Sequence, residues 1–382
     1  MKVYLKDLKS KKEAIKVIKD IGVDKVVISS LAEKSRFRVF KIADVPSPAA
    51  TIIKQIAISR GTDAAVHRKV IVNGVTHSNV ILPGSIRELK LIARELKKQP
   101  FGLPEVGLEI IRLLKERDKK INFKIMGVLN ITPDSFSDGE EYFSADSARE
   151  RFDKIIKDGA DIIDVGAESS RPNAESIKED EELRRLNPVL PLFKNCPIPV
   201  SIDTCKSEVA KKALSSGAEI LNDISALRMD TKMVNIAKDY NSFIVLMHMK
   251  GTPKTMQDNP YYDNVVKEIF DFFDERIEFC LSNNITEDKI ILDPGIGFGK
   301  RQIDNLNILN NLEEFTSLGF PVLIGVSRKS FIGNITGQPP KERLCGSIAA
   351  LIYSYLHGVG IFRVHDVRET KDALDVISSL EN

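Results

Sequence analysis

The sequence of 382 residues has no tryptophan and only four cysteines, Cys196, Cys205, Cys280 and Cys345. Because the cysteines are widely scattered and form no C-x-x-C pair, they indicate neither a zinc site nor a disulfide framework. No apolar stretch approaches the roughly 20 residues that span a bilayer, and the charged N-terminus has no signal-peptide core. We therefore expect a protein of the reducing cytoplasm with no membrane partner.

A strong excess of either charge is also absent. The chain has 56 basic and 54 acidic residues, and its formal net charge is +2. We interpret the charges as interspersed, which argues against a general binder of nucleic acid or of membrane surfaces. Any cationic site must then be local. The length suits two domains, or one large barrel with an extension.

From residue 124 onward, short apolar runs alternate with longer amphipathic segments. The runs are rich in Val and Ile, as is typical of strands buried on both faces of a parallel sheet; they are 124–130, 161–168, 198–204, 219–224, 243–249, 289–295, 321–327 and 360–366. The segments 146–159, 206–217 and 341–358 predict helices between them. Eight such units predict an α/β fold, a (β/α)8 barrel of the TIM type, with an open doubly wound sheet as the alternative.

Residues 1–120 have a different pattern and predict a small α/β domain before a barrel at 121–382. The expected helices are 11–22, 49–61 and 85–99, the expected strands are 24–30, 69–74 and 79–82, and 102–120 is expected to be a connecting helix.

Each predicted barrel strand has, at its C-terminal end, a residue that a hydrophobic core would not favour. The series is Asn130, Glu168, Asp203, Asn222, His248, Asp293, Ser327, and Arg363 with His365. In a (β/α)8 barrel the C-terminal ends of the strands carry the active site. A single polar strand end is commonly only a cap of the next helix, but caps do not explain all eight. We therefore expect one polar site at this face.

The central strand ends Asp203, Asn222 and Asp293 are rich in hydrogen-bond acceptors. Buried carboxylates are costly unless they are paired or accept hydrogen bonds. The group therefore favours a ligand with several N–H donors, such as a 2-amino-4-oxo heterocycle. A structural salt bridge to a lysine or arginine elsewhere in the chain is the alternative.

Cations follow other strand ends, where they predict an anion site: they are Arg171, Arg328, Lys329, Arg363 and His365. The oxygen-rich loop 130–138 would suit Mg²⁺, which commonly bridges substrate phosphates. Cys205 is a poor nucleophile candidate without a visible base, and "GIGFGK" (295–300) is not a phosphate-binding P-loop. The sequence thus predicts a ring pocket with a metal-neutralised diphosphate at its mouth.

Eight motifs together resemble the motif series of the dihydropteroate synthase family, in the family's order over about 124–379. They are "GVLNITPDSFSDG", "GAESSRPN", "SIDT", "LNDI", "LMHMKGTPKTMQ", "LDPGIGFGK", "GVSRKSFIG" and "RVHD". The resemblance implies a (β/α)8 barrel that joins 6-hydroxymethyl-7,8-dihydropterin diphosphate to 4-aminobenzoate, giving 7,8-dihydropteroate and diphosphate. It also implies Mg²⁺ as cofactor and a homodimer, and it makes this chain a long form with an extra N-terminal domain.

The resemblance also implies roles for individual residues. The pterin would be bound by Asp203, Asn222, Asp293 and Lys329, and its pocket would be lined by Met247 and Phe298. The diphosphate would be bound by Asn130, Arg363 and His365, with the metal at Asn130. The mobile second loop would contain Ser170, Arg171 and Pro172, and Ser330 would lie near the aminobenzoate. Of these, Lys329, Arg363 and Asp203 are the expected catalytic residues. The implied reaction breaks the C–O bond to diphosphate first, so it needs no protein nucleophile.

Three positions depart from the family pattern: Ala167 and Asn173 stand where Gly is usual, and Ser170 stands where Thr is usual. All three belong to the second loop, so they leave open whether the second substrate is 4-aminobenzoate or a bulkier, ribosylated aminobenzene. A pterin-dependent methyltransferase is the alternative function. It would share the acceptors that hold the pterin but would need no diphosphate site.

Overall fold

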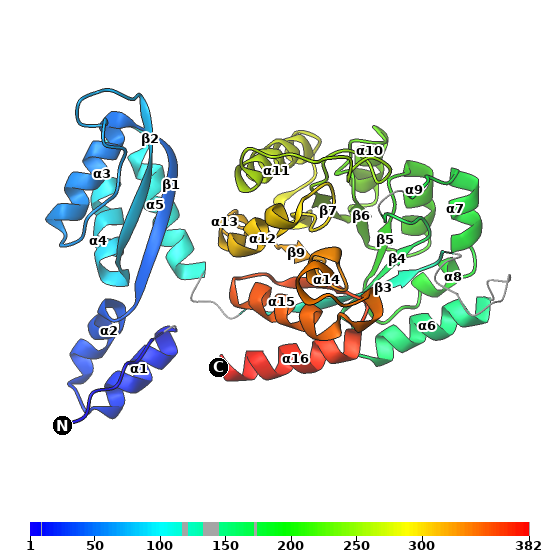
Figure 1. Cartoon of the computed structure of the whole chain (residues 1–382), viewed down its shortest axis with the longest axis horizontal. Helices are drawn as coiled ribbons and strands as arrows, with labels where there is room; N and C mark the ends of the chain where they lie inside the picture. Colours follow the sequence, from blue (N-terminus) through cyan, green and yellow to red (C-terminus); the bar gives the residue numbers. More distant parts are fainter. Residues whose placement is uncertain (9, 117–120, 133–144, 172–173, 382) are drawn as a thin grey trace. The chain divides into compact units, whose positions relative to one another are not determined.

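The computed structural model describes residues 1–8, 10–116, 121–132, 145–171 and 174–381 (Figure 1). The chain folds as two compact units, Met1–Lys120 and Ile121–Asn382. Residues 1–120 contain 26 basic and 13 acidic residues, a net charge of +13, whereas residues 121–382 contain 30 and 41, a net charge of −11. The interpretation of the charges as interspersed is therefore wrong: the small net charge arises because two oppositely charged units cancel.

The second unit is the expected (β/α)8 barrel. Its strands are β3 (Lys124–Asn130), β4 (Ile162–Gly166), β5 (Val200–Asp203), β6 (Ile220–Asp223), β7 (Phe243–Met247), β8 (Ile290–Asp293), β9 (Leu323–Ile324) and β10 (Ile361–Val364). All neighbouring strands pair in parallel, in the order β8-β7-β6-β5-β4-β3-β10-β9. A parallel bridge between Leu292 and Val322 joins the two ends of this order and closes the barrel. The open-sheet alternative is thus excluded.

Helices surround the strands on the outside of the barrel (Figure 1). They are α6 (Ala145–Lys157), α7 (Glu179–Leu186), α8 (Leu190–Phe193), α9 (Ser207–Ser215), α10 (Met233–Asp239), α11 (Val265–Ser282), α12 (Gln302–Asn310), α13 (Leu312–Thr316), α14 (Ser330–Thr336), α15 (Leu344–Leu356) and α16 (Val367–Leu380). The large core lies between these helices and the strands.

A second apolar layer fills the inside of the barrel. It takes one side chain from each strand except β5: Met126, Ile162, Ile220, Val245, Ile291, Leu323 and Ile361. These residues lie at or near the beginnings of their strands, so the layer closes the N-terminal end of the barrel. The polar strand ends therefore face an opening at the other end only.

The first unit packs helices on a two-stranded antiparallel sheet. The strands are β1 (Phe37–Pro46) and β2 (His77–Ser85), and the helices are α1 (Lys11–Asp20), α2 (Lys25–Lys34), α3 (Ser47–Ser59), α4 (Ile86–Leu96) and α5 (Leu103–Glu116). The unit has its own apolar core, formed largely by α3, α4, α5 and β2.

Two predicted strands of this unit are wrong, and β1 was not predicted. Residues 69–74 form turns, and 24–30 lies mostly in helix α2. There the Asp24 side chain accepts the Val26 N–H at 2.9 Å as a helix cap, and Ile28 and Ala32, four residues apart, pack in a small cluster with α1. The capping and the tertiary contact outweigh the strand preference of the Val-Val-Ile run.

Among the residues that the structure describes, no helix is both long enough and apolar enough to cross a membrane.

Candidate active site

A cavity opens among the C-terminal ends of the barrel strands; we call it the barrel-mouth cavity. It encloses about 340 Å³, part of it open to solvent, and its lining is Asn222, Ile224, Met247, Asp293, Gly295, Ile296, Phe298, Gly325, Lys329 and Arg363. Six of the predicted site residues are in this lining, although the chain separates them by up to 141 positions. The topology brings them together because parallel strands end at the same face.

The deepest polar groups of the site form one network around Asp164, a fully buried residue in the middle of β4. Arg363 donates from Nε to Asp164 Oδ2 at 2.6 Å and from Nη2 to Asp203 Oδ2 at 2.7 Å. Asn222 and Ser201 also donate to the Asp164 carboxylate. The salt-bridge alternative therefore holds for Asp203 in this structure, through Arg363. Sequence reasoning missed Asp164, although a charged residue inside an apolar run was a usable signal.

Burial and mutual charge shift the protonation of these groups. Burial raises the pKa of Asp203 to about 7, against the opposing effect of Arg363. Burial and, after it, the nearby Arg363 together lower the pKa of Lys329 to about 8. For Arg363 itself, the carboxylates of Asp164 and Asp203 outweigh burial and hold the pKa above its usual range. The site thus contains a permanent cation beside two groups that titrate near neutral pH.

Asp293 ends β8 and is almost completely buried at the cavity wall. Its Oδ1 accepts the Gly295 N–H at 2.7 Å, and burial raises its pKa. On the same side, the Lys329 ammonium lies 4.2 Å from the centre of the Phe298 ring. Met247 and Phe298 belong to a small apolar cluster at the cavity. These positions suit a flat ring held between an apolar wall and polar edges.

The loop after β8 needs its glycines to form this wall. Gly295 and Gly299 have φ angles of +66° and +63°, and an added Cβ would lie only 2.1 Å and 2.2 Å from the carbonyl oxygens of His248 and Lys250. The loop therefore packs directly against the backbone that follows β7. "GIGFGK" thus forms part of the cavity wall by close backbone packing.

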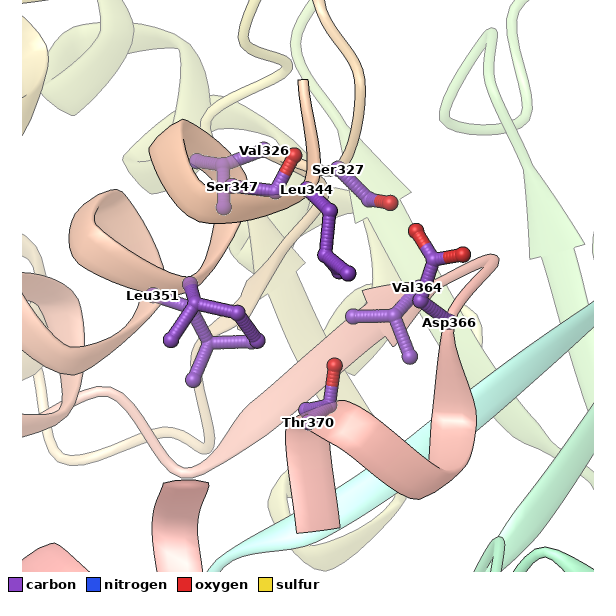
Figure 2. A pocket seen from close by; sticks show the side chains of 9 residues that line it. Val326, Ser327, Leu344, Ser347, Leu351, Val364, Asp366 and Thr370 are labelled. Carbon is purple, nitrogen blue, oxygen red and sulfur yellow. The ribbon is translucent and has the colours of Figure 1, made fainter. Parts of the chain in front are cut away.

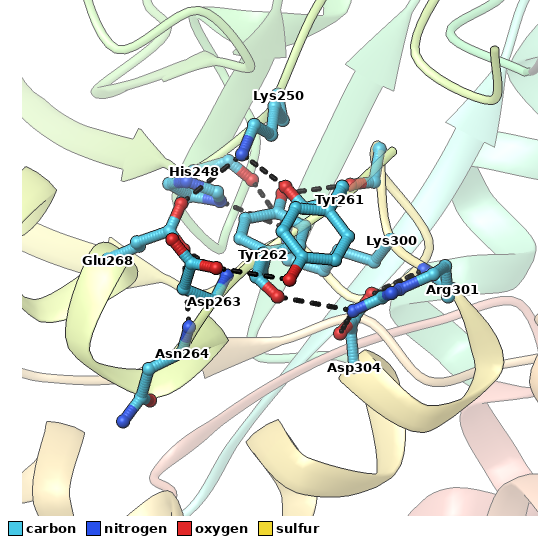
Figure 3. A network of polar contacts seen from close by, with 11 residues as sticks. His248, Lys250, Tyr261, Tyr262, Asp263, Asn264, Glu268, Lys300, Arg301 and Asp304 are labelled. Atoms are coloured by element: carbon cyan, nitrogen blue, oxygen red, sulfur yellow. Dashed lines mark hydrogen bonds and ion pairs between the residues drawn. The ribbon is translucent and has the colours of Figure 1, made fainter. Parts of the chain in front are cut away.

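Lys300 joins the same two loops by hydrogen bonds (Figure 3). It is buried, and its ammonium lies 3.0 Å from His248 Nδ1 and 3.1 Å from the carbonyl oxygens of His248 and Phe298. Burial lowers the pKa of Lys300 to about 7 and that of His248 to about 2. Neutral His248 therefore accepts a hydrogen bond from Lys300, and it is not in the lining of the barrel-mouth cavity.

An outer layer of contacts holds the segment after β7 in place. Lys250 lies 4.2 Å from the Tyr262 ring centre and also contacts Glu268 and the Tyr261 carbonyl (Figure 3). The Tyr262 hydroxyl donates to the Gly299 carbonyl at 2.8 Å. The cavity wall is thus cross-linked to α11.

His365 and Ser330 follow the cavity-lining residues Arg363 and Lys329 in the sequence, but they are not in the cavity lining themselves. The His365 ring nitrogen Nδ1 is 3.1 Å from Ser327 Oγ, and Ser330 begins α14, directly after Lys329. Beside Ser327 is a smaller, shallow pocket, lined mainly by α15 with residues of β10 and α16 (Figure 2). Its rim includes Asp366, which forms an ion pair with Arg328. This pair joins the segment that carries Lys329 to the one that carries His365.

The second loop is not in the cavity lining. Ser170 is half-buried and Arg171 is exposed, and neither is in the lining of the barrel-mouth cavity. Glu168, at the start of the loop, accepts the Ile177 N–H at 3.0 Å and forms an ion pair with Lys206 at 2.5 Å. Pro172, Asn173 and residues 133–138 of the first loop lie outside the described residues.

Few of the described residues at the site could ligate a metal ion. Asn130, the predicted Mg²⁺ ligand, ends β3 and offers one neutral amide oxygen. Within the described ranges, no group of three or more His, Cys, Asp or Glu residues could hold a metal ion. One amide oxygen suits a Mg²⁺ that keeps most of its coordination for water and substrate phosphates, so Asn130 fits such an ion only together with a substrate.

The barrel, with its acceptors, cations and apolar wall at one face, has the features of a pterin pocket, and comparison with known proteins agrees. Residues 126–365 match the model of the pterin-binding enzyme family, and the chain belongs to this family. More particularly, it is 43% identical over 260 residues to the dihydropteroate synthase of Haemophilus influenzae, covering 68% of this chain and 94% of that protein.

Two further matches extend the comparison. The dihydropteroate synthase of Xanthomonas albilineans, solved in complex with 7,8-dihydropteroate, has 37% identity and a TM-score of 0.62, covering 68% of this chain and 94% of that one. The bifunctional dihydropteroate synthase/dihydropteroate reductase of Helicobacter pylori has 36% identity over 368 residues, covering 95% of this chain and 96% of that protein. The predicted family and fold are confirmed, and these relatives support the synthase over the methyltransferase alternative.

Proposed function

We propose that the barrel is a dihydropteroate synthase, which condenses 6-hydroxymethyl-7,8-dihydropterin diphosphate with 4-aminobenzoate to give 7,8-dihydropteroate and diphosphate. The observation that supports the proposal is the barrel-mouth cavity, whose lining combines the acceptors Asn222 and Asp293 with the cations Lys329 and Arg363. Dihydropteroate synthases are also the relatives that cover the barrel at 43% identity. The direct test is release of diphosphate from the two substrates, with the pteroate product identified by mass.

The residues of the site have different roles in this reaction. Asp203, Asn222 and Asp293 accept N–H bonds from the pterin, and Met247 and Phe298 contact its faces. Arg363 neutralises the charge that develops on the leaving diphosphate, and Lys329 assists it from the cavity wall. Burial lowers the pKa of His365 to about 4, so His365 would contact the diphosphate as a neutral hydrogen-bond donor. The C–O bond breaks, the diphosphate leaves, and the amine attacks the methylene carbon and then loses a proton. Cys205 takes no part, because burial holds its thiol pKa well above the usual value.

A diphosphate site with Mg²⁺ is part of the proposal. Asn130 would hold the ion, which, when bound, neutralises the diphosphate. Since a ligand that binds only the folded protein stabilises it, diphosphate should raise the melting temperature, and more so with Mg²⁺. Arg363→Ala should abolish this rise and leave binding of a phosphate-free pterin mostly intact. If neither anion nor metal changes the melting temperature of the wild type, the diphosphate site is wrong.

The second substrate depends on the second loop. Ser170 and Arg171 would contact it from that loop, and Ser330 from the start of α14. Ser170 lacks a methyl group that threonine would offer, a difference of only about 1 kcal/mol, so 4-aminobenzoate should react. We expect Ser170→Thr with Asn173→Gly to shift the ratio of kcat/KM between 4-aminobenzoate and its ribosylated analogue by about tenfold at most. An unchanged ratio would remove the second loop from substrate choice.

A second activity is favoured by the comparison that includes the first unit. The H. pylori protein named as a dihydropteroate reductase matches 95% of this chain, whereas the synthase of H. influenzae matches 68%. We therefore propose that the full chain also reduces 7,8-dihydropteroate. Hydride and a proton would be added across a C=N bond of the pterin, and an external two-electron donor such as a reduced nicotinamide would be oxidised.

A shortened chain beginning at Asn122 separates the two activities, because synthases that span only the barrel exist as whole proteins. The full chain should oxidise the reduced nicotinamide when dihydropteroate is added, measured by absorbance. The shortened chain should keep the synthase activity and lose this oxidation. If both chains reduce the pterin equally, residues 1–120 have another role.

A homodimer and a cytoplasmic location complete the proposal. Ile335 on α14 and Tyr353 and Leu356 on α15 are exposed apolar side chains of the kind that a dimer contact covers. All four cysteines are free thiols, as expected in a reducing compartment. Sedimentation at several protein concentrations tests the dimer, and cell fractionation tests the location.

A further inference from the structure

We propose that Asp164 is a positioning residue that orients Asn222 and Arg363 in the barrel-mouth cavity, so that the Asn222 amide oxygen faces the pterin ring. The inference rests on the proposed synthase function and adds to it a residue outside the predicted site. Asp164 is not in the cavity lining and lies one layer deeper in the barrel.

The Asp164 carboxylate receives donors from three other strands. Its Oδ1 accepts from Ser201 Oγ on β5 at 2.6 Å, and its Oδ2 accepts from Arg363 Nε on β10 at 2.6 Å. The Asn222 Nδ2 on β6 lies 3.3 Å from the first oxygen and 3.2 Å from the second. A carboxylate can accept hydrogen bonds but cannot donate them. Every neighbour must therefore turn a donor toward it.

This requirement decides which end of the Asn222 amide faces the cavity. With the amide reversed, its oxygen would lie about 3.2 Å from a carboxylate oxygen, and two acceptors would face each other. The N–H₂ group therefore faces Asp164, and the amide oxygen points away from it. Within the described part of the chain, no group donates to this oxygen, and Asn222 lines the cavity. The oxygen is thus a preset acceptor for a ligand.

The same carboxylate fixes the plane of the Arg363 guanidinium. Asp164 holds Nε, and Asp203 holds Nη2. Because the Arg363 guanidinium is planar, hydrogen bonds to two of its nitrogens fix its orientation. The third nitrogen, Nη1, has no hydrogen bond within the described ranges, so it is the one available to an incoming anion. One buried carboxylate therefore sets an acceptor for the ring and a donor for the leaving group.

Exchanging the two partners tests this assignment. Asp164→Asn leaves one acceptor oxygen for three donors and turns an N–H₂ group toward the others, so it no longer fixes the orientation of Asn222. Asn222→Asp places two carboxylates against each other. Loss of a charge-assisted hydrogen bond corresponds to roughly ten- to a hundredfold in affinity, and we expect each variant to bind 6-hydroxymethylpterin that much more weakly by calorimetry. In the double variant, the new amide can donate to the new carboxylate, which still presents an oxygen to the cavity. We expect its affinity to return to within about tenfold of the wild type.

Controls separate positioning from general damage to the fold. Asp161→Asn makes the same substitution directly before β4, where the carboxylate accepts the Ile125 N–H at 2.8 Å. It should change the melting temperature without changing pterin affinity. Steady-state kinetics supply the second readout: the Asp164 and Asn222 variants should raise KM for the pterin diphosphate and leave KM for 4-aminobenzoate nearly unchanged.

Two results would overturn the inference. One is wild-type pterin affinity in Asp164→Asn, and the other is a double variant that binds no better than Asn222→Asp alone. The second comparison still decides the matter if Asp164→Asn does not fold. A wild-type protein that forms no dihydropteroate would instead refute the proposed function, so the two failures are distinguishable.

Discussion

Replacement of Asp293 by Asn changes the polarity of the cavity wall without changing its shape. In the wild type, one carboxylate oxygen accepts the Gly295 N–H at 2.7 Å, and the residue lines the cavity beside Lys329. In Asp293→Asn, the amide oxygen must remain on the Gly295 N–H, because the amide nitrogen cannot accept a hydrogen bond. The N–H₂ group is then directed into the cavity, where a pterin would also direct N–H donors.

The expected cost follows from this reversal. A hydrogen bond to a charged acceptor contributes about 1.5–3 kcal/mol, and a donor left unpaired on either side adds about 1–3 kcal/mol. The sum corresponds to a loss of about two to four orders of magnitude in pterin affinity. The substitution also affects Lys329: burial lowers the pKa of Lys329 to about 8, and the neighbouring Asp293 carboxylate opposes that fall. Without that carboxylate, the pKa of Lys329 should fall.

The two effects have different pH dependence, which calorimetry can separate. Binding that needs the Lys329 ammonium is complete below the pKa of Lys329 and is lost as the pH rises through it. The variant should therefore lose additional affinity between pH 6 and pH 8, where the wild type still holds most of its charge. Thermal melts without ligand control for folding. An Asp293→Asn protein that binds a pterin as tightly as the wild type at pH 6 would refute the reasoning.

Three further predictions concern stability. Gly299→Ala should lower the melting temperature by several degrees, since its Cβ would lie 2.2 Å from the Lys250 carbonyl oxygen; Gly337→Ala, at φ +74° with nothing within 4 Å, should lower it less. Lys300 has a pKa of about 7 in the folded state, against 10.5 in the unfolded chain. The free energy of unfolding should therefore rise with pH between pH 7 and pH 10.5. Lys300→Met should flatten this rise, as measured by urea titrations at several pH values. Lys206→Met leaves two carboxylates facing each other and should cost on the order of 3 kcal/mol by urea unfolding, with Lys206→Arg recovering part of it.

The barrel could be predicted because its strands carry a strong local signal. All eight apolar runs contain a strand of the closed sheet, and the helix expected at 146–159 is α6, Ala145–Lys157. Strands buried on both faces need apolar residues throughout, so tertiary structure and sequence pattern agree there. In the first unit they conflict. The run 24–30 has a strand-like composition, but the cap at Asp24 and contacts with α1 make most of it helix.

The partners of the charged side chains were harder to predict, because they depend on three-dimensional neighbours. Arg363 and Asp164 are 199 positions apart in the chain and 2.6 Å apart in the barrel. His248 was expected at the polar face with the other strand ends, yet it contacts Lys300 and is not in the cavity lining. A pattern can place a residue at the end of a strand. Only the packing of neighbouring strands decides which group its side chain meets.

The pairing of Asp203 with Arg363 also shows why a salt bridge and a ligand site need not be alternatives. A cavity that presents several acceptors and two cations would be costly if each charge were left unpaired away from water. At 2.7 Å these two groups satisfy each other, and burial still raises the pKa of Asp203 to about 7, so the pairing does not fully offset desolvation. Under the proposed function, a pterin diphosphate would direct N–H donors to Asp203 and its anion to Arg363. Such a ligand would compensate for the desolvation that the pairing alone leaves unbalanced.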